Sequence, residues 1–440
     1  MSPMHLNVNI TTAGVHRGAW RRSQESARAF HDPGHYVRNA RIAERGLLDA
    51  VFLADQSYLH AGPLPGAALD PLITVAAMAQ ATTRIGLIAS VSTTFHHPYT
   101  IARAFASLEH LSGGRTGWNV VTTRNPPAGR NYGFPDLPSR EERYARAAES
   151  VDVVTRLWGS WEPGALVADR DAGVQVDQSR VHPIDHVGQY FSVTGPLQVP
   201  PSPQGRPLIV QAGGSSGGLD LAAGYADAVF TSQVTAEAAR EYYTNLKKAV
   251  VQRGRAPESL AVLPGLVFTL GSTEAEATRR RDDLNELVPE ADRLAAFAGW
   301  IGVDPAVLDL DKPFPLHELR DIGDTYFSVG FDRSARIHLE ANRHRTVREL
   351  VAEGPAGHWK ITGTPEQVAD AMEEWYRGGA ADGFNLMADA YPDGLEDFVD
   401  HVVPILQRRG LFRREYDATT LRGHYGLAER LAPTVTEEIS

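Results

Sequence analysis

The segment from Gln211 to Gly218 reads Gln-Ala-Gly-Gly-Ser-Ser-Gly-Gly and has the composition of an anion-binding turn. It follows a short apolar run and precedes a helical pattern, Leu219–Tyr225. Glycines let backbone N–H groups converge on a phosphate, and a helix N-terminus adds a favourable dipole. The segment lacks the Lys-Ser/Thr of a Walker A loop and the spacing of a dinucleotide fingerprint. The motif alone fits a phosphate site and a plain flexible turn equally well.

Short polar side chains follow several other apolar runs. They include Asp55, the run Ser92-Thr93-Thr94, Asn119 and, nearer the N-terminus, His16. Most are neutral hydrogen-bonding groups, whereas a glycosidase needs paired carboxylates and Asp55 is the single carboxylate among them. This set favours binding of a polar ligand over hydrolysis by a carboxylate pair.

Two pairs of histidines raise the question of a metal site. One pair is His96-His97, and the other is His182 with His186 in a segment that contains proline. A proline-containing segment does not place residues four apart on one helical face, so the second pair lacks a ligand geometry. We interpret both pairs as hydrogen-bonded histidines and predict no metal.

The elements that would position these side chains alternate as short apolar strands and helical patterns. Runs such as Val51-Phe-Leu-Ala54 are typical of parallel strands buried on both faces. Ser139 with Glu142 suggests a capping box, and Thr364-Pro365 with Gln367 begins a second clear helix. The predicted strands are Leu6–Thr12, Ala50–Ala54, Ile85–Val91, Thr116–Val121, Leu208–Gln211, Ala228–Thr231, Leu260–Thr269 and Phe384–Met387.

Eight strands alternating with helices predict an α/β fold, a (β/α)8 TIM barrel. The chain has 440 residues, against about 250 for a plain barrel, so we expect large insertions after strands 4 and 7. They would span about residues 125–206 and 271–360, within one domain over residues 1–440. Both would emerge at the C-terminal ends of the strands, where barrels carry their active sites.

The amino-acid composition argues against several classes of binding partner and of functional site. There are 43 Lys and Arg residues against 54 Asp and Glu, a net charge of −11, which argues against nucleic acid or an anionic membrane as the main partner. The chain has no cysteine, which excludes disulfides, thiolate metal sites and a cysteine nucleophile. No apolar run approaches the roughly 20 residues of a membrane span, and we expect a cytoplasmic protein.

Longer motifs of the chain resemble those of the bacterial-luciferase-like flavin-dependent monooxygenases. The similarity runs from about His16 to Leu427 and points to the group of nitrilotriacetate monooxygenase, dibenzothiophene-sulfone monooxygenase and pristinamycin synthase. The motifs are Gly117-Trp-Asn-Val-Val-Thr-Thr123, Glu142-Arg-Tyr-Ala-Arg146, Leu157-Trp-Gly-Ser-Trp161, Val181-His-Pro-Ile-Asp-His-Val-Gly188, Phe191-Ser-Val-Thr-Gly-Pro-Leu197, Pro203-Gln-Gly-Arg-Pro-Leu-Ile-Val-Gln-Ala-Gly213, Gly363-Thr-Pro-Glu-Gln367, Gly379-Ala-Ala-Asp-Gly-Phe-Asn-Leu-Met387 and Leu406-Gln-Arg-Arg-Gly-Leu-Phe-Arg413.

The resemblance implies a two-component enzyme. Such an enzyme receives FMN in its reduced form, FMNH2, from a separate NAD(P)H:flavin reductase, and oxygenates a small organic substrate with O2. The reaction often cleaves a C–N or C–S bond and would proceed through a flavin peroxide, at C4a or at N5. The resemblance also leaves a homodimer and a homotetramer open, and it does not name the substrate.

Carried over by position, the resemblance implies a set of flavin-binding residues. Tyr144 and Ser215 would serve the phosphate. Arg140 stands where the family frequently has a histidine, and an arginine pairs strongly with phosphate. Gly214 and Ser216 replace a serine and a proline of the usual phosphate turn. The whole implied set is Asp55, Thr93, Thr94, Asn119, Arg140, Tyr144, Gly214, Ser215 and Ser216.

Three residues are the candidates for the chemistry itself. Thr94 and Asn119 follow or end neighbouring strands, so we expect them to be neighbours at the barrel mouth, where they would hydrogen-bond oxygen atoms. His16 is a candidate for proton transfer or substrate contact, because imidazole titrates near neutrality. The alternative for His16 is a hydrogen-bonded side chain that holds the first loop.

Two further functions remain open at this point. One is a deazaflavin-dependent oxidoreductase of the same superfamily, which transfers hydride without O2. The other is a non-catalytic barrel that stores or senses flavin. Oxygen uptake that depends on both reduced FMN and a substrate separates a monooxygenase from both.

Overall fold

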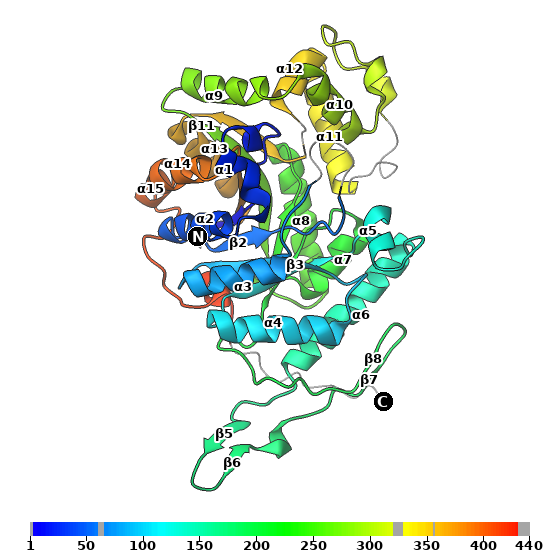
Figure 1. The fold of residues 1–440 in the computed structure, drawn as a ribbon, viewed down its shortest axis with the longest axis vertical. Helices are drawn as coiled ribbons and strands as arrows, with labels where there is room; N and C mark the ends of the chain where they lie inside the picture. Colours follow the sequence, from blue (N-terminus) through cyan, green and yellow to red (C-terminus); the bar gives the residue numbers. More distant parts are fainter. Residues whose placement is uncertain (1–2, 60–65, 320–328, 355–356, 430–440) are drawn as a thin grey trace.

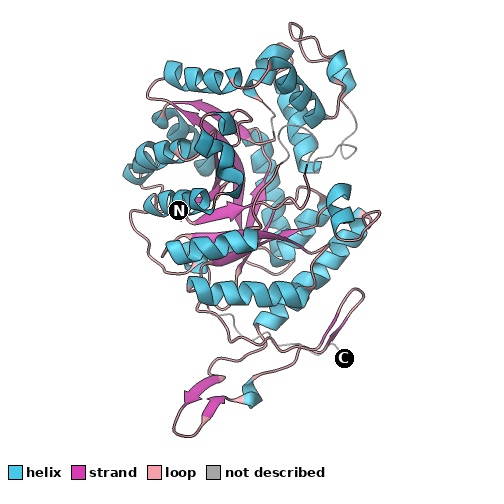
Figure 2. Ribbon diagram, in the orientation of Figure 1, coloured by secondary structure: helices cyan, strands magenta, loops and turns pink. Residues whose placement is uncertain are grey.

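The computed structural model describes residues 3–59, 66–319, 329–354 and 357–429. Eight parallel strands close into a barrel in the order β1-β2-β3-β4-β9-β10-β11-β13, and β13 pairs with β1. Figure 2 shows these strands at the centre, surrounded by helices. The barrel strands are β1 (His5–Asn9), β2 (Ala50–Leu53), β3 (Gly86–Ser92), β4 (Thr116–Val121), β9 (Leu208–Gln211), β10 (Ala228–Thr231), β11 (Ala261–Leu270) and β13 (Gly383–Ala388).

The barrel confirms the predicted (β/α)8 fold. Each predicted strand corresponds to one barrel strand, and the largest error is at the end of β1, where the prediction extends to Thr12 and the strand ends at Asn9. Continuous burial of β2, β3 and β9 agrees with strands that are covered on both faces.

The helices around the barrel begin at recognisable caps. Asp32, Asp70, His97 and Thr364 each accept a hydrogen bond from the first turn of a helix that starts with proline. Thr364 and Gln367 form a complete capping box, whereas at α6 Ser139 contributes the cap bond alone. The helices are α2 (Pro33–Arg45), α3 (Pro71–Ala81), α4 (Pro98–Ser112), α6 (Arg140–Trp158), α7 (Ser216–Tyr225), α8 (Ala236–Gln252), α13 (Pro365–Arg377), α14 (Asp393–Asp397) and α15 (Val403–Arg408).

Alternation along the strands decides which side chains face the barrel interior. In β4, Trp118 packs outward against Phe105 of α4 and Trp158 of α6, so the following residue, Asn119, points inward. Near the N-terminal ends of the strands, apolar side chains fill the interior together with Tyr425 from the C-terminal segment. Polar side chains are also buried here, since Asn7 of β1 accepts a hydrogen bond from the Tyr425 hydroxyl at 3.0 Å.

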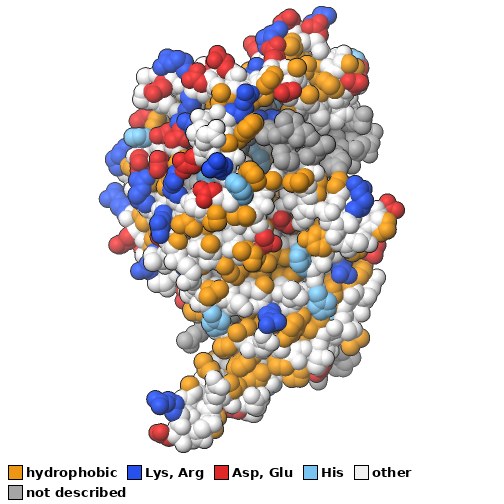
Figure 3. Space-filling model, viewed as in Figure 1, with side chains coloured by type: hydrophobic (Ala, Val, Ile, Leu, Met, Phe, Trp, Pro, Cys, Tyr) orange, Lys and Arg blue, Asp and Glu red, His pale blue; other side chains and the backbone are white. Residues whose placement is uncertain are grey.

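The chain between β4 and β9 contains α5 (Pro126–Asn131), α6 and an arm. The arm carries two short hairpins, β5 (Leu166–Asp169) with β6 (Val174–Val176), and β7 (His186–Val187) with β8 (Ser192–Val193). Figure 1 shows it extending away from the barrel below α4. Hydrophobic side chains gather along the arm and over α3 and α4 in Figure 3. The expected homodimer or homotetramer stays a prediction.

The chain between β11 and β13 contains α9 (Glu274–Glu286), α10 (Glu290–Ile301), α11 (Val329–Ala341), α12 (Val347–Glu353), β12 (Trp359–Gly363) and α13. Residues 320–328 and 355–356 of this interval lie outside the described residues. Helices α10, α11 and α12 share a hydrophobic cluster of their own. Strand β12 pairs with the second half of β11, whose first half pairs with β10. Figure 1 shows these helices above one end of the barrel.

Among the residues described, no helix combines the length and apolar character that crossing a bilayer requires.

Candidate functional site

A pocket of about 220 Å³ opens at the C-terminal ends of β2, β4 and β9. We call it the arginine pocket, because Arg124, Arg140 and Arg143 line it together with Tyr144 and Ser215. The pocket brings together five of the predicted flavin-binding residues, namely Asp55, Arg140, Tyr144, Gly214 and Ser215.

The glycine-rich turn joins β9 to α7 at this pocket. Helix α7 begins at Ser216, three residues before the expected Leu219, because the Ser215 side chain caps it by accepting from the Gly218 N–H at 3.2 Å. The Ser215 hydroxyl also donates to the Tyr144 hydroxyl at 3.0 Å. A Cβ on Gly217 would come within 2.9 Å of the Tyr144 ring, so glycine allows α6 to approach α7. Ser216 is the first helical residue and does not line the pocket.

The arginines give the pocket a strong positive charge. Burial lowers the pKa of Arg124 to about 10 and lowers that of Arg143, yet both remain charged at neutral pH. The Arg143 Nε is buried with no hydrogen-bond partner among the described residues. Three guanidinium groups beside a helix N-terminus suit a phosphate.

Sequence reasoning named Arg140 but missed Arg124 and Arg143. The signals were present, since Arg124 directly follows Thr122-Thr123 at the end of β4 and Arg143 is the arginine of the Glu-Arg-Tyr motif. A basic residue just after a barrel strand is a candidate ligand contact, because that end of the strand faces the active site.

Asp55 also lines the arginine pocket, just after β2. Its carboxylate accepts a hydrogen bond from the Ser57 hydroxyl at 2.9 Å. The surrounding protein atoms limit its hydration and raise its pKa, and the Ser57 bond opposes that rise. Asp55 is exposed toward the pocket and can therefore accept hydrogen bonds from a ligand.

Thr93, Thr94 and Asn119 do not line the arginine pocket but are buried beside it. The Thr93 hydroxyl donates to the Val121 carbonyl at 3.2 Å. Asn119 donates through Nδ2 to the Ser90 hydroxyl at 2.8 Å. The strand register pairs Asn119 with Ser90, four residues before Thr94, and the expectation that Asn119 and Thr94 are neighbours at the barrel mouth stays a prediction. Asn119 lies deeper in the barrel because β4 continues to Val121.

Several buried side chains in and just after the barrel strands carry polar atoms that no described residue satisfies. Thr94 Oγ1 and Asn119 Oδ1 are buried without a hydrogen-bond partner in the described part of the chain. The same holds for Asn9 Oδ1 and for both side-chain polar atoms of Asn385 on neighbouring strands. A buried polar atom without a partner costs about 1–3 kcal/mol, so several together suit a polar ring system. Together with the arginine pocket, they fit a flavin phosphate and a flavin ring.

His16 lies apart from the arginine pocket and lines a second cavity of about 470 Å³. Its Nδ1 accepts from the Gly18 N–H at 3.0 Å, so the proton resides on Nε2, which donates to Asn285 Oδ1 at 3.3 Å. Asn285 in turn donates to the Ala352 carbonyl at 2.9 Å. Burial lowers the His16 pKa, and the Asn285 bond opposes this. These hydrogen bonds support the interpretation that His16 holds the first loop in place. A role of His16 in proton transfer stays a prediction.

The two histidine pairs make hydrogen bonds within the protein. His96 donates from Nδ1 to the Ser92 carbonyl at 3.0 Å, and His97 caps α4 by accepting from the Tyr99 N–H. His182 contacts Glu162 at 2.7 Å and His186 contacts Glu149 at 3.0 Å. The described residues contain no group of three His, Asp or Glu side chains suited to a metal.

Known proteins share this architecture over nearly the full length. Residues 10–382 match the family described as luciferase-like monooxygenase. Nitrilotriacetate monooxygenase component A of Aminobacter aminovorans is 40% identical over 442 residues, covering 97% of this chain and 96% of its own. Dibenzothiophene-sulfone monooxygenase of Rhodococcus erythropolis is 38% identical over 440 residues, covering 95% and 94%.

A solved structure agrees with the sequence matches. EDTA monooxygenase from a Chelativorans species superposes with a TM-score of 0.80 at 37% identity, covering 97% of this chain and 99% of its own. The resemblance predicted from the motifs is therefore confirmed. The chain belongs to the luciferase-like monooxygenases, a family of flavin-dependent enzymes.

Proposed function

We propose that the protein is the oxygenase component of a two-component system. It takes FMNH2 from a separate NAD(P)H:flavin reductase and uses O2 to oxygenate a small organic substrate, with cleavage of a C–N or C–S bond where the substrate carries one at the reacting atom. The observation that carries this proposal is the arginine pocket, with three guanidinium groups at the N-terminus of α7.

The chain's own residues would bind and orient the cofactor. Arg124 and Arg143 would hold the phosphate by charge-assisted hydrogen bonds, with Ser215 and Tyr144 as hydroxyl partners. When bound, reduced FMN supplies the electrons that reduce O2, so that one oxygen atom enters the substrate and the other leaves as water.

Thr94 and Asn119 would act at the ring end of the cofactor. Their Oγ1 and Oδ1 atoms are buried and have no partner in the part of the chain that the structure describes, so hydrogen bonds that a ligand forms there are not weakened by competing water. The Asn119 amide is held by Ser90, which fixes its orientation before a ligand arrives. The His16 cavity opens at the ends of β1, β11 and β13, the same end of the barrel, and supplies space for a substrate.

The test is oxygen uptake and product formation with FMN and a generic flavin reductase. A panel of aminocarboxylates, sulfones, thioethers and cyclic amides is offered, and incorporation of ¹⁸O from ¹⁸O2 identifies a monooxygenated product. We expect product formation to require FMN, reductase, O2 and one substrate class together. Hydride transfer from a reduced deazaflavin, or tight FMN retention without turnover, would overturn the proposal.

A further inference from the structure

The His16 cavity combines apolar walls with a concentration of basic residues. Its volume of about 470 Å³ lies in the range of small-molecule sites. Helices α9, α10 and α12 and strands β11 and β12 contribute to it. The apolar walls include Val15, Val267, Val288, Trp300 and Met387. The charged residues that line it are Arg17, Arg281, Arg293, Glu353, Lys360 and Asp389.

Both acidic residues of the cavity are paired with arginines that do not line it. Arg280 contacts Asp389 through Nε at 2.7 Å and through a second nitrogen at 3.0 Å. Arg345 contacts Glu353 at 2.6 Å. Arg345 pairs with Glu353 from outside the cavity, whereas Arg280 is shared among Asp389, Asp393 and Asp397 and so offsets the charge of Asp389 only in part.

The basic residues that line the cavity differ in whether they form ion pairs. Arg281 pairs with Asp282 at 2.9 Å. Arg293 makes no ion pair with any described residue, and its Nε is buried without a hydrogen-bond partner. Lys360 donates from Nζ to the backbone carbonyl of Glu353 at 2.6 Å, and it makes no direct ion pair with a described carboxylate, although the Glu353 charge acts on it from nearby. Arg17, Arg293 and Lys360 therefore make no ion pair with a carboxylate among the described residues, and of these three Arg17 is exposed.

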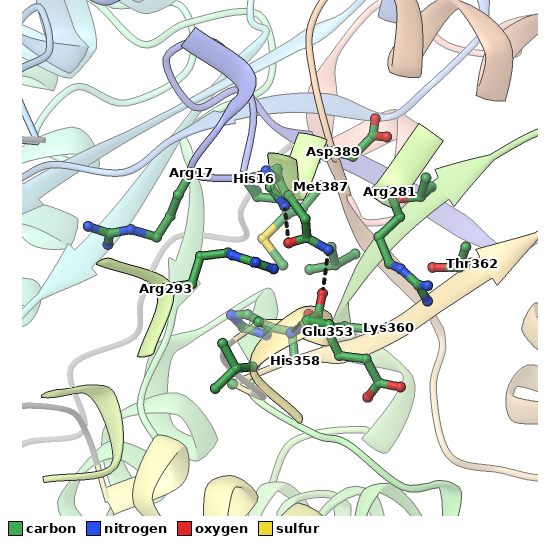
Figure 4. A pocket seen from close by; sticks show the side chains of 18 of the residues that line it. His16, Arg17, Arg281, Arg293, Glu353, His358, Lys360, Thr362, Met387 and Asp389 are labelled. Atoms are coloured by element: carbon green, nitrogen blue, oxygen red, sulfur yellow. Dashed lines mark hydrogen bonds between the residues drawn. The ribbon is translucent and has the colours of Figure 1, made fainter. Parts of the chain in front are cut away.

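The direction of Arg293 places its charge where a ligand would lie. In Figure 4 its guanidinium points into the cavity, in the space between His16 and His358. His358 contributes no competing charge, since burial lowers its pKa to about 3. A planar guanidinium with unused donors matches a carboxylate in a paired geometry.

We propose that this cavity binds the substrate as an organic carboxylate, with Arg293 as its direct partner, Lys360 as a second cation and the apolar remainder against Trp300 and Met387. The proposal rests on the proposed function for the oxidation that follows, but carboxylate binding itself needs no turnover. Arg293 and Lys360 are specificity-determining residues in this assignment.

The test compares two molecules of nearly equal shape, 3-phenylpropanoate and the neutral 3-phenylpropanamide. Each is titrated into the full chain by ligand-observed NMR, first without and then with saturating FMN. A charge-assisted bond in a desolvated site predicts that the carboxylate binds at least about tenfold more tightly than the amide. Equal affinities in the wild-type protein would overturn the proposal without reference to any variant.

Substitutions test whether Arg293 is the residue that binds the carboxylate. We expect Arg293→Met to weaken 3-phenylpropanoate at least about tenfold and to leave 3-phenylpropanamide nearly unchanged. Arg279→Met is the matched control, because Arg279 is exposed on α9 and does not line the cavity. A variant that loses affinity for acid and amide alike would instead indicate a damaged cavity and contradict the assignment.

A second control separates this cavity from the arginine pocket. Arg143→Met should leave carboxylate binding unchanged, and loss of binding in that variant would place the probe in the arginine pocket and refute the proposal. Oxygen uptake with FMN and reductase is measured independently. The proposed function can therefore fail while carboxylate binding stands, and carboxylate binding can fail while oxygen uptake stands.

Discussion

The Ser215 hydroxyl donates a hydrogen bond to the Tyr144 hydroxyl over 3.0 Å and so joins the N-terminus of α7 to the first turns of α6. Ser215 at the same time caps α7 by accepting from Gly218. The Tyr144 hydroxyl keeps its own proton, which it can donate to a phosphate oxygen. This hydrogen bond therefore holds helices α6 and α7 together at a single anion site.

Removing each hydroxyl of this pair should have a different effect. Ser215→Ala removes the cap of α7, so it should lower the free energy of unfolding by about 1 kcal/mol and also weaken FMN. Tyr144→Phe should weaken FMN about three- to tenfold and leave the melting temperature nearly unchanged. Fluorescence titration with FMN and thermal melts of both variants check this. Equal loss of stability in both would contradict the division of roles.

Phosphate recognition should dominate cofactor affinity. Riboflavin lacks the phosphate, so it should bind about tenfold to a thousandfold more weakly than FMN. Arg143→Met should lower FMN affinity at least about tenfold and leave riboflavin affinity unaffected, because Arg143 lines the arginine pocket and its Nε has no partner among the residues that the structure describes. Side-by-side titrations of both flavins measure the two effects. If wild-type protein binds both flavins equally, the phosphate assignment is wrong.

Asn119 and Thr94 should affect turnover more than flavin binding. Asn119→Ala or Thr94→Val should lower the rate about ten- to a thousandfold, the range for losing one positioned hydrogen-bonding group. FMN affinity should change less than about tenfold, because the phosphate contacts remain. Rapid-mixing spectra with O2 and thermal melts are recorded together. A variant that melts early yet turns over at the wild-type rate would show that these residues only stabilise the strands.

Carboxylate binding in the His16 cavity should depend on pH through Lys360. Burial lowers the Lys360 pKa to about 7, so the ammonium is present below that pH and lost above it. The groups that face it are Glu353 and the histidines His16, His338 and His358, whose pKa values burial lowers. Because the pKa of each histidine lies below its ordinary value of about 6.5, none of the three gains or loses appreciable charge as the pH rises from about 7 to about 9.

The affinity for 3-phenylpropanoate should accordingly stay constant below about pH 7 and fall about tenfold by about pH 9. Because a bound carboxylate raises the Lys360 pKa, binding should take up a proton between these limits. Lys360→Met should give a weaker and pH-independent affinity. A wild-type affinity that rises with pH would contradict the role of Lys360.

Much of the barrel is readable in the sequence because its signals are local. The buried strand β9 appears as the apolar run Leu208–Gln211, and Thr364 and Gln367 mark the start of α13. Burial on both faces demands continuous apolar residues, and a helix end demands a nearby hydrogen-bonding side chain. Both requirements are met within a few residues, so they leave a pattern without reference to the rest of the chain.

Only some features of the glycine-rich turn can be predicted from the nearby sequence. Its composition fits a phosphate site, and the cap from Ser215 to Gly218 is a local feature. Its partners are not local, since Tyr144 and Arg143 come from a helix that precedes the turn by about seventy residues. The arginine pocket thus forms only when the barrel closes and brings α6 beside α7.

The sequence by itself determined the barrel, the family and the end of the strands at which ligands bind. Tertiary structure decided which charges remain available there. Asp389 and Glu353 form ion pairs with Arg280 and Arg345, whereas Arg293 is left without an ion pair among the residues described. Electrostatic pairing acts through space over a few ångströms, and Arg280 and Asp389, which are 109 residues apart in the sequence, meet only in the folded protein.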